Sequence, residues 1–338
     1  MKFIPLLFIV AIFYLINIFF LKKKLLLNYS GQIHQTFTGI KKVPLTGGIF
    51  ILIMCVYVFF QINYLFVFFI LSIFIIGLLS DLSYITSVKA RFLIQLLIVS
   101  TFVYILDITV GPTRVSYLDL ILEYKIFSLI FTIFCLMIVI NGSNFIDGLN
   151  GLVLGYYISI FGVLIKLSLL EEVNINYLTS TYFMFILIYL YLLNILNKLF
   201  LGDSGAYLIG LFFSILLIEI YTLNQNFSPF FVILLLWMPC FENLFSIIRK
   251  FSYKISPTSP DNDHFHQLIF FFVKKAFKIK NNFANNFASL VIITYNLFVF
   301  YLGSLDISNT KYQISLISSN IIIYLVVYKI LFKYKHSQ

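Results

Sequence analysis

Charge is scarce in this chain of 338 residues. Only 11% of the residues are Asp, Glu, Lys or Arg, whereas 61% are hydrophobic. A soluble globular domain has about 25% charged and about 45–50% apolar residues. Outside the apolar runs, no stretch is long enough to bury a core of its own. We therefore expect a single integral membrane domain over residues 1–338 and no separate soluble domain.

Cysteine is also rare, and its placement excludes most cysteine chemistry. Cys55, Cys135 and Cys240 each lie in an apolar run, and none belongs to a CxxC pair. We interpret all three as packed apolar side chains rather than as metal ligands or disulfide partners.

Long apolar runs are what the sequence has in abundance. They are continuous rather than alternating, and in lipid such runs predict helices, because the backbone must satisfy its own hydrogen bonds. The fold class we predict is all-α: a polytopic transmembrane helical bundle of about 11 spans (10–11), in which residues 61–63 form a tight turn. The expected spans are 3–21, 45–61, 64–79, 92–108, 125–141, 152–170, 178–197, 206–223, 229–247, 284–304 and 313–332.

Basic residues predict the orientation of these spans. Eighteen of the 23 Lys and Arg residues fall on one set of connections, and Lys22, Lys23 and Lys24 follow the first apolar run, as in an anchor that is not cleaved. The positive-inside rule then places the N-terminus outside and the C-terminus in the cytoplasm. The expected cytoplasmic loops are about 22–44, 80–91, 142–151, 198–205 and 248–283. Orientation and anionic membrane lipids account for the net charge of +10, so we expect no nucleic-acid partner.

Acidic residues divide into two groups under this orientation. One group lies on the cytoplasmic side, where intramembrane or membrane-edge acids are candidates for function: Asp81, Asp147, Asp203, Asp261 and Asp263. The other group lies outside without a surrounding motif, and we interpret it as solvated loop charge: Asp107, Asp119, Glu123, Glu171, Glu172 and Asp306.

The cytoplasmic acids have distinctive neighbours. Residues 141–151 read NGSNFIDGLNG, with carboxamides at Asn141, Asn144 and Asn150 around Asp147, and residues 201–205 read LGDSG around Asp203. Asp203 alone is also typical of a helix N-cap. Flanking glycines allow close backbone approach to a ligand and leave amide groups to face phosphate.

The connection between the spans 229–247 and 284–304 contains two more polar residues of interest. His264 and His266 lie two positions apart beside Asp263. No third and fourth soft ligand is evident, which argues against zinc.

Together, these residue types suit phosphoryl transfer. Carboxylates and carboxamides are ligands for Mg²⁺, which binds one or two carboxylates together with phosphate oxygens. Basic residues at the same membrane surface, Lys41, Lys42, Lys89 and Arg91, suit phosphate. A site at this surface would let one reactant be a lipid and the other a cytoplasmic solute.

Between about residues 34 and 270 the sequence resembles the polyprenyl-phosphate N-acetylhexosamine-1-phosphate transferases. The resemblance follows five motifs in the order of that family: residues 43–48 (VPLTGG), residues 77–81 (GLLSD) with the downstream stretch 87–95, residues 141–152, residues 201–205, and residues 263–266 (DHFH). It implies transfer of a sugar-1-phosphate, of N-acetylglucosamine type, from a UDP-sugar to undecaprenyl (polyprenyl) phosphate. It also implies a multi-pass protein of the bacterial inner membrane, initiation of a cell-envelope polysaccharide, and the option of a homodimer.

The resemblance assigns roles to individual residues. It implies a catalytic set of Asp81, Asp147 and Asp203, with Asp203 and Asn144 as ligands of Mg²⁺ (or Mn²⁺). Asp81 would face the lipid phosphate as a base or orienting group. Substrate contacts are implied for Lys89, Asn141, Asn150, His264 and His266.

Three positions depart from the family pattern. Ser80 replaces the first Asp of an acidic pair, Asn150 replaces the second Asp of Asp-Gly-x-Asp, and Gln267 ends the histidine cluster. Ser80 leaves Asp81 as the only acid there, but a lipid phosphate is already partly dianionic near pH 7 and can react without a base.

Other functions stay open at this point. A phospho-MurNAc-pentapeptide transferase usually keeps its acidic pair and histidine cluster intact, and an inactive relative is also compatible with the departures. A lipid or solute transporter would place polar residues at the bilayer midplane in repeated halves. We find no internal repeat, although Glu242 lies within a predicted span.

Overall fold

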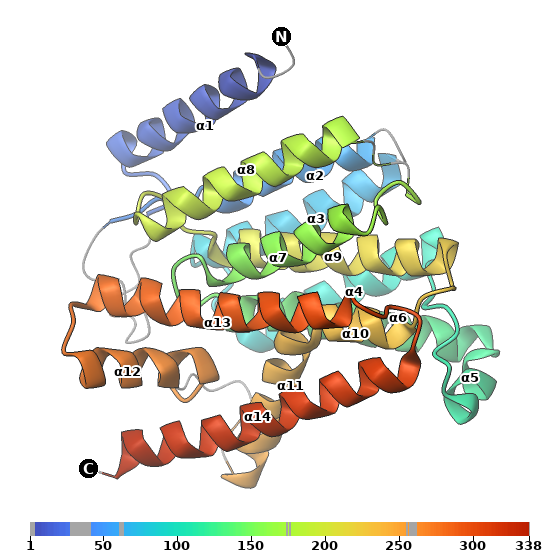
Figure 1. Cartoon of the computed structure of the whole chain (residues 1–338). Coiled ribbons are helices and arrows are strands. Elements are labelled where there is room, and N and C mark those ends of the chain that lie inside the picture. The colour runs from blue at the N-terminus through green and yellow to red at the C-terminus, as the bar shows by residue number, and fades with distance from the viewer. Residues whose placement is uncertain are drawn as a thin grey trace.

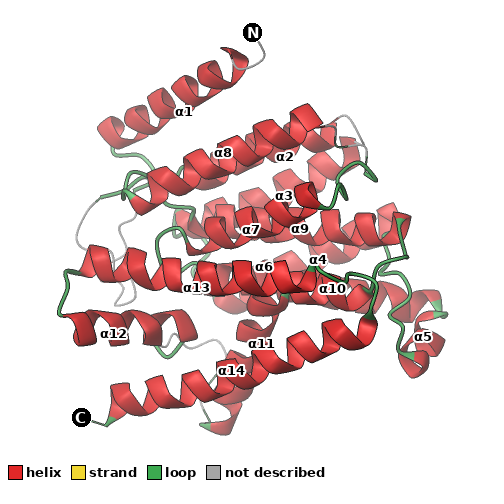
Figure 2. Cartoon of the chain, viewed as in Figure 1, coloured by secondary structure: helices red, strands yellow, loops and turns green. Residues whose placement is uncertain are grey.

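The computed structural model describes residues 4–27, 42–60, 64–173, 175, 177–254, 256 and 262–337. Lys41, Asp261 and the turn predicted at residues 61–63 lie outside these ranges. Within them the regular structure is helical, as Figure 2 shows, apart from an isolated bridge between Leu27 and Pro44.

The helices, in chain order, are α1 (Ile4–Lys23), α2 (Gly47–Phe60), α3 (Tyr64–Asp81), α4 (Val88–Leu106), α5 (Ser116–Leu122), α6 (Lys125–Ile146), α7 (Leu152–Lys166), α8 (Tyr177–Ile195), α9 (Gly202–Leu223), α10 (Pro229–Leu235), α11 (Trp237–Ser252), α12 (Phe265–Phe277), α13 (Asn281–Gly303) and α14 (Thr310–His336).

These helices confirm the predicted fold class, an all-α polytopic membrane protein. Each of the eleven predicted spans contains a helix. Among the described residues seven helices are long and apolar enough to cross a membrane, and the bent pair α10–α11 makes an eighth. Large apolar side chains are exposed on the outer helices, such as Phe68 on α3 and Leu97 on α4, as expected for surfaces that face lipid. The count of eleven spans and the orientation stay predictions.

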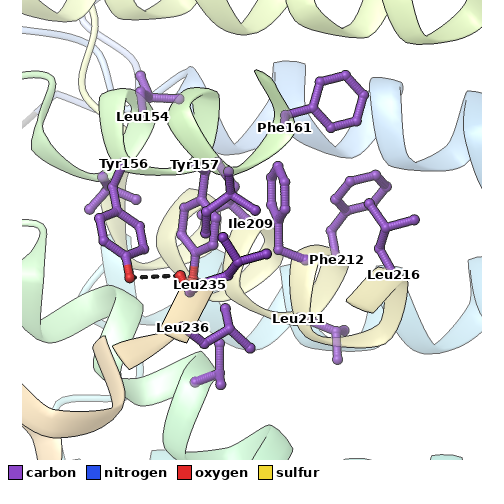
Figure 3. Packing of buried hydrophobic residues seen from close by; sticks show 14 of the residues in the cluster. Leu154, Tyr156, Tyr157, Phe161, Ile209, Leu211, Phe212, Leu216, Leu235 and Leu236 are labelled. Atoms are coloured by element: carbon purple, nitrogen blue, oxygen red, sulfur yellow. Dashed lines mark hydrogen bonds between the residues drawn. The ribbon is translucent and has the colours of Figure 1, made fainter. Parts of the chain in front are cut away.

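The span expected over 229–247 is not one straight helix. α10 and α11 meet at Leu236 with a bend of 72°. Pro239 explains the break, because it has no N–H to donate to the carbonyl of Leu235. The hydroxyl of Tyr156 on α7 donates to that carbonyl instead, at 2.8 Å (Figure 3). A buried side chain thus satisfies the backbone group that proline frees.

Two of the predicted cytoplasmic loops contain helical structure. The loop expected over 142–151 begins in helix, because α6 continues to Ile146 and carries Asn141 and Asn144 on its last turns. The loop expected over 248–283 contains the end of α11 and the whole of α12, an amphipathic helix that buries Leu268, Phe270 and Val273. The short helix α5, near the opposite end of α6, was not predicted either.

α9 is the central helix of the bundle. It packs against α2, α3 and α6, while α1 and α14 lie at opposite edges of the molecule (Figure 1). Small residues permit the close approach: a Cβ added at Gly77 of α3 would lie 2.3 Å from the Cα of Ser204, and one at Gly48 of α2 would lie 2.8 Å from the backbone N of Gly205. The amino end of α9 is therefore fixed against two other helices.

Candidate active site

The first turn of α9 is capped by an acid from another helix. Leu201 occupies the N-cap position without a side-chain hydrogen bond. The carboxylate of Asp81, at the end of α3, accepts from the backbone N of Asp203 at 2.7 Å and of Ser204 at 3.2 Å, and from the hydroxyl of Ser204 at 2.7 Å. Asp81 thus does the capping that sequence reasoning considered for Asp203, and the Asp203 carboxylate is left for other contacts.

Gly202 makes this arrangement feasible. Its φ is +69°, in the left-handed region, and an added Cβ would lie 2.6 Å from Oδ2 of Asp81. Only glycine combines that backbone conformation with such close approach of a carboxylate.

The Asp203 carboxylate meets two side chains from the Asp81 motif. Ser80 donates its hydroxyl to Oδ2 at 2.5 Å, and Arg91 on the first turn of α4 makes an ion pair with the same oxygen. Arg91 also donates to Ser80. The serine that stands in place of a family aspartate is therefore part of the site, and it hydrogen-bonds to the acid that a second aspartate would have repelled.

The C-terminal end of α6 contributes two more polar residues, Asn144 and Asp147, beside Asp81 and Asp203. Burial, together with the charges of Asp203 and Asp81, raises the pKa of Asp147 to about 8. This mutual repulsion indicates that three acids from three helices share one weakly solvated environment. The side-chain amide of Asn144 donates to the hydroxyl of Tyr207 at 3.3 Å, and Tyr207 lies one turn beyond Asp203 on α9.

The two histidines lie against the α6–α7 turn. The ring of His264 stacks on Phe145 with ring centroids 5.5 Å apart, and on His266 with centroids 5.7 Å apart. A Cβ added at Gly148 would lie 2.1 Å from Nε2 of His266, so the second ring lies directly over the residue after Asp147. The structure thus brings the histidine segment to the acidic site.

The other three predicted substrate contacts, Asn150, Asn141 and Lys89, stay predictions, and the structure gives their surroundings. Asn150 is buried, and its side chain donates to Asn197 at 3.0 Å and Asn286 at 3.2 Å, which ties the α6–α7 turn to α13. The side chain of Asn141 donates to the carbonyl of Met137 on its own helix. Lys89 is exposed on the first turn of α4, two residues from Arg91.

The second acidic group lies at the far end of the bundle. Lys125 begins α6 and pairs with Asp107 at 3.0 Å, while Asp147 follows the last residue of the same helix. Twenty-two helical residues separate the two ends by roughly 33 Å. Glu172 accepts from Asn224 just after α9 ends. These contacts agree with the interpretation of this group as loop charge away from the site.

Sequence reasoning missed several members of the site. Arg91 was noted as a basic residue, but its ion pair with Asp203 joins residues 112 positions apart. Ser204, Phe145 and Tyr207 carried no signal beyond their neighbours. Glu242 did carry one, because an acid inside an apolar span is costly unless it has partners.

The comparisons with known proteins agree with this geometry. The family description "Glycosyl transferase family 4" matches residues 63–221, which hold Asp81, Asp147 and Asp203. A probable undecaprenyl-phosphate N-acetylglucosaminyl 1-phosphate transferase of Bacillus subtilis (strain 168) is 30% identical over 213 residues, 59% of this chain and 56% of the relative.

Two further relatives are named undecaprenyl-phosphate alpha-N-acetylglucosaminyl 1-phosphate transferase. The Yersinia pestis protein is 30% identical over 151 residues, 42% of this chain and 41% of the relative. The Thermotoga maritima protein is 26% identical over 264 residues, 78% of this chain and 77% of the relative. The chain spans about half the length of the first two relatives. The motifs, the fold and these matches agree in making the chain similar to the undecaprenyl-phosphate N-acetylglucosaminyl 1-phosphate transferases.

Proposed function

We propose that this protein transfers N-acetylglucosamine-1-phosphate from UDP-N-acetylglucosamine to undecaprenyl phosphate. A phosphate oxygen of the lipid attacks the sugar-bearing phosphorus. The bond from that phosphorus to the bridging oxygen breaks, and UMP leaves with the electron pair. The product is a lipid-linked diphospho-sugar. The names of the relatives support this choice of substrates.

The observation that carries the proposal is the meeting of three acids at one end of the bundle. Asp81 ends α3, Asp147 follows α6 and Asp203 begins α9, and they are linked by hydrogen bonds and by mutual charge. Arg91 adds a cationic group that suits phosphate. Positioning and charge neutralisation are most of what phosphoryl transfer asks of a protein.

The donors fit Mg²⁺ (or Mn²⁺) as a partly protein-bound ion. No group of three His, Cys, Asp or Glu side chains within the described ranges is disposed to hold a metal. Mg²⁺ prefers one or two carboxylates together with phosphate oxygens. Burial and the charges of Asp203 and Asp81 together raise the pKa of Asp147, and a cation at this place would offset both effects. Asp203 and Asn144 would hold the ion, which would neutralise charge on the diphosphate.

The contacts of Asp81 favour an orienting role over that of a base. Both carboxylate oxygens accept hydrogen bonds from the first turn of α9. Asp81 therefore fixes Asp203 rather than offering a free oxygen to the lipid. The lipid phosphate, with a second pKa of about 6, supplies its own nucleophilic oxygen near pH 7. The reaction therefore needs no carboxylate at position 80, where this chain has Ser80.

We place the reaction at the cytoplasmic face of a bacterial inner membrane, as the first step of a cell-envelope polysaccharide. The multi-pass fold agrees with this location, and the basic connections predicted to be cytoplasmic flank the same helix ends as the acids. Homodimer formation stays a prediction.

The test uses purified full-length protein in nanodiscs with undecaprenyl phosphate, Mg²⁺ and a panel of UDP-sugars. UMP release with UDP-N-acetylglucosamine is expected, and Asp203→Ala should abolish it. Glu123→Gln, an exposed acid at the far end, is the matched control and should leave the rate unchanged.

Two outcomes would overturn the proposal. UMP release only with UDP-MurNAc-pentapeptide would indicate the peptidoglycan reaction. Substrate accumulation in vesicles without UMP release would indicate a transporter.

A further inference from the structure

A buried glutamate lies behind the histidine segment. Glu242 on α11 is 1% exposed, and both of its carboxylate oxygens have partners. Oε1 lies 2.9 Å from Nδ1 of His264 and accepts from the backbone N of Phe265 at 3.3 Å, while Oε2 accepts from the hydroxyl of Tyr324 at 2.5 Å. A carboxylate within a membrane helix is costly, so such a set of donors points to a definite task.

The imidazole ring of His264 lies between Glu242 and the acidic site. His264 is 7% exposed and stacks on Phe145, which lies between Asn144 and Asp147 in the sequence. The ring of His266 stacks on that of His264 and lies against Gly148. A line of contacts thus runs from Glu242 through His264 to the turn that carries Asp147.

The backbone at this point is fixed as well. Gln267, the departure that ends the histidine cluster, accepts from the backbone N of His264 at 3.2 Å and so helps to begin α12. The carbonyl of Asp263 accepts from Tyr328 at 3.0 Å. With the main chain held on both sides of His264, the hydrogen bond from its side chain decides how the ring is turned.

We propose that Glu242 is a positioning residue for the transfer reaction and acts through His264; this rests on the proposed function. A carboxylate can only accept, so Nδ1 of His264 carries its proton toward Glu242, which fixes the tautomer and the plane of the ring. The ring then presents Nε2 in one protonation pattern, and the stacked pair of histidines is held over the Asn144–Gly148 turn. The class of substrate that this arrangement serves is the diphosphate-linked sugar.

The experiment is a double-mutant cycle on UMP release, with kcat and KM for UDP-N-acetylglucosamine measured separately. Glu242→Gln keeps the size and one acceptor but removes the charge, and we expect kcat to fall about 10- to 100-fold with KM changed much less. His264→Gln should lower kcat by about 10²-fold or more. The double variant should be no slower than His264→Gln alone, because the two residues act as one unit.

Glu219→Gln is the matched control. Glu219 is a half-buried glutamate on α9 and has no part in the histidine contacts, so this variant should keep the wild-type kcat. Glu242→Asp, which restores the charge on a shorter arm, should recover part of the kcat lost in Glu242→Gln. If Glu242→Gln does not fold, Tyr324→Phe removes the bond to the other oxygen and should lower kcat a few-fold.

The two proposals fail in different ways. A wild-type protein that releases no UMP overturns the proposed function and this inference with it. An active wild-type protein whose Glu242→Gln variant stays within twofold in kcat overturns only the positioning role. So does a cycle in which the effects of Glu242→Gln and His264→Gln simply multiply.

Discussion

α9 and α14 are almost equally hydrophobic, yet α9 lies at the centre of the bundle and α14 at its edge (Figure 1). The most apolar stretch of α9 has a mean hydropathy of 2.0, and that of α14 has 1.9. In α9, 78% of that stretch is buried inside the protein, whereas in α14 it is 22%. In a membrane, hydropathy reports contact with apolar surroundings and does not distinguish lipid from protein.

Small residues make the difference. The amino half of α9 contains Gly205, Ala206 and Gly210, and its neighbours contribute Gly48 and Gly77, so the backbones approach closely. α14 instead carries large side chains that contact two acids beside the histidine segment: Tyr324 donates to Glu242, and Tyr328 and Lys335 donate to Asp263. One helix builds the acidic site by packing, and the other supports the histidine segment by polar contacts.

The largest effect should come from filling the α3–α9 contact. Gly77→Val would place its Cβ 2.3 Å from the Cα of Ser204. The backbone of α9 cannot move far enough to relieve this clash, because it is packed against other helices. We expect a loss of about 2–3 kcal/mol or failure to fold, seen as a drop in the thermal unfolding midpoint. Ser318→Val at an exposed position of α14 is the control, and an equal loss in both variants would remove the distinction drawn here.

A smaller effect is expected from the burial of Asp147 and its nearness to the charges of Asp203 and Asp81. Its pKa is raised to about 8 in the folded protein, above the value of about 3.9 in an unfolded chain. The folded state therefore binds more protons between these values, and this group costs increasing stability as the pH rises from about 4 to 8.

Without divalent cations, Asp147→Asn should remove that cost. The thermal unfolding midpoints of the variant and of wild type are compared in EDTA across this pH range. The midpoint of the variant should exceed that of wild type by an amount that grows with pH and reaches a few degrees near pH 8. A constant difference at every pH would show that the pKa of Asp147 is not raised in the folded protein.

The smallest effect should come from the α14 side. Burial raises the pKa of Asp263, but hydrogen bonds from Lys335 and His336 outweigh it and hold the pKa below its usual value. Lys335→Met should therefore cost at most about 1 kcal/mol, present at neutral pH and vanishing as Asp263 is protonated in acid. Lys329→Met, exposed on the same helix, should cost nothing; the same loss in both variants would exclude a specific contact with Asp263.

Much of this arrangement could be predicted from short stretches of sequence. Apolar runs gave all eleven helical segments, and glycine and asparagine beside Asp81, Asp147 and Asp203 marked one end of the bundle. The distribution of Lys and Arg separated these acids from those near Lys125, which the structure places at the far end. Each of these signals depends on residues only a few positions apart.

The remainder depends on distant residues. That Asp81 rather than Asp203 caps α9 follows from a contact 122 positions apart, and the link from Glu242 to Tyr324 spans 82. The break at Leu236 has a visible cause in Pro239, but Tyr156, which satisfies the freed carbonyl, is on another helix. Lys89 and Arg91 are equally basic in the sequence, and only the packing of α4 shows which one contacts Asp203.

The central claim is that acids from α3, α6 and α9 form one site for a divalent ion and a diphosphate. The most direct measurement is Mn²⁺ binding followed by electron paramagnetic resonance, with and without UDP-N-acetylglucosamine. The account predicts one Mn²⁺ bound to wild type in the presence of the nucleotide sugar, lost in Asp203→Asn, weakened in Asp147→Asn and unchanged in Glu171→Gln at the far end. Equal Mn²⁺ binding by wild type and Asp203→Asn would contradict it.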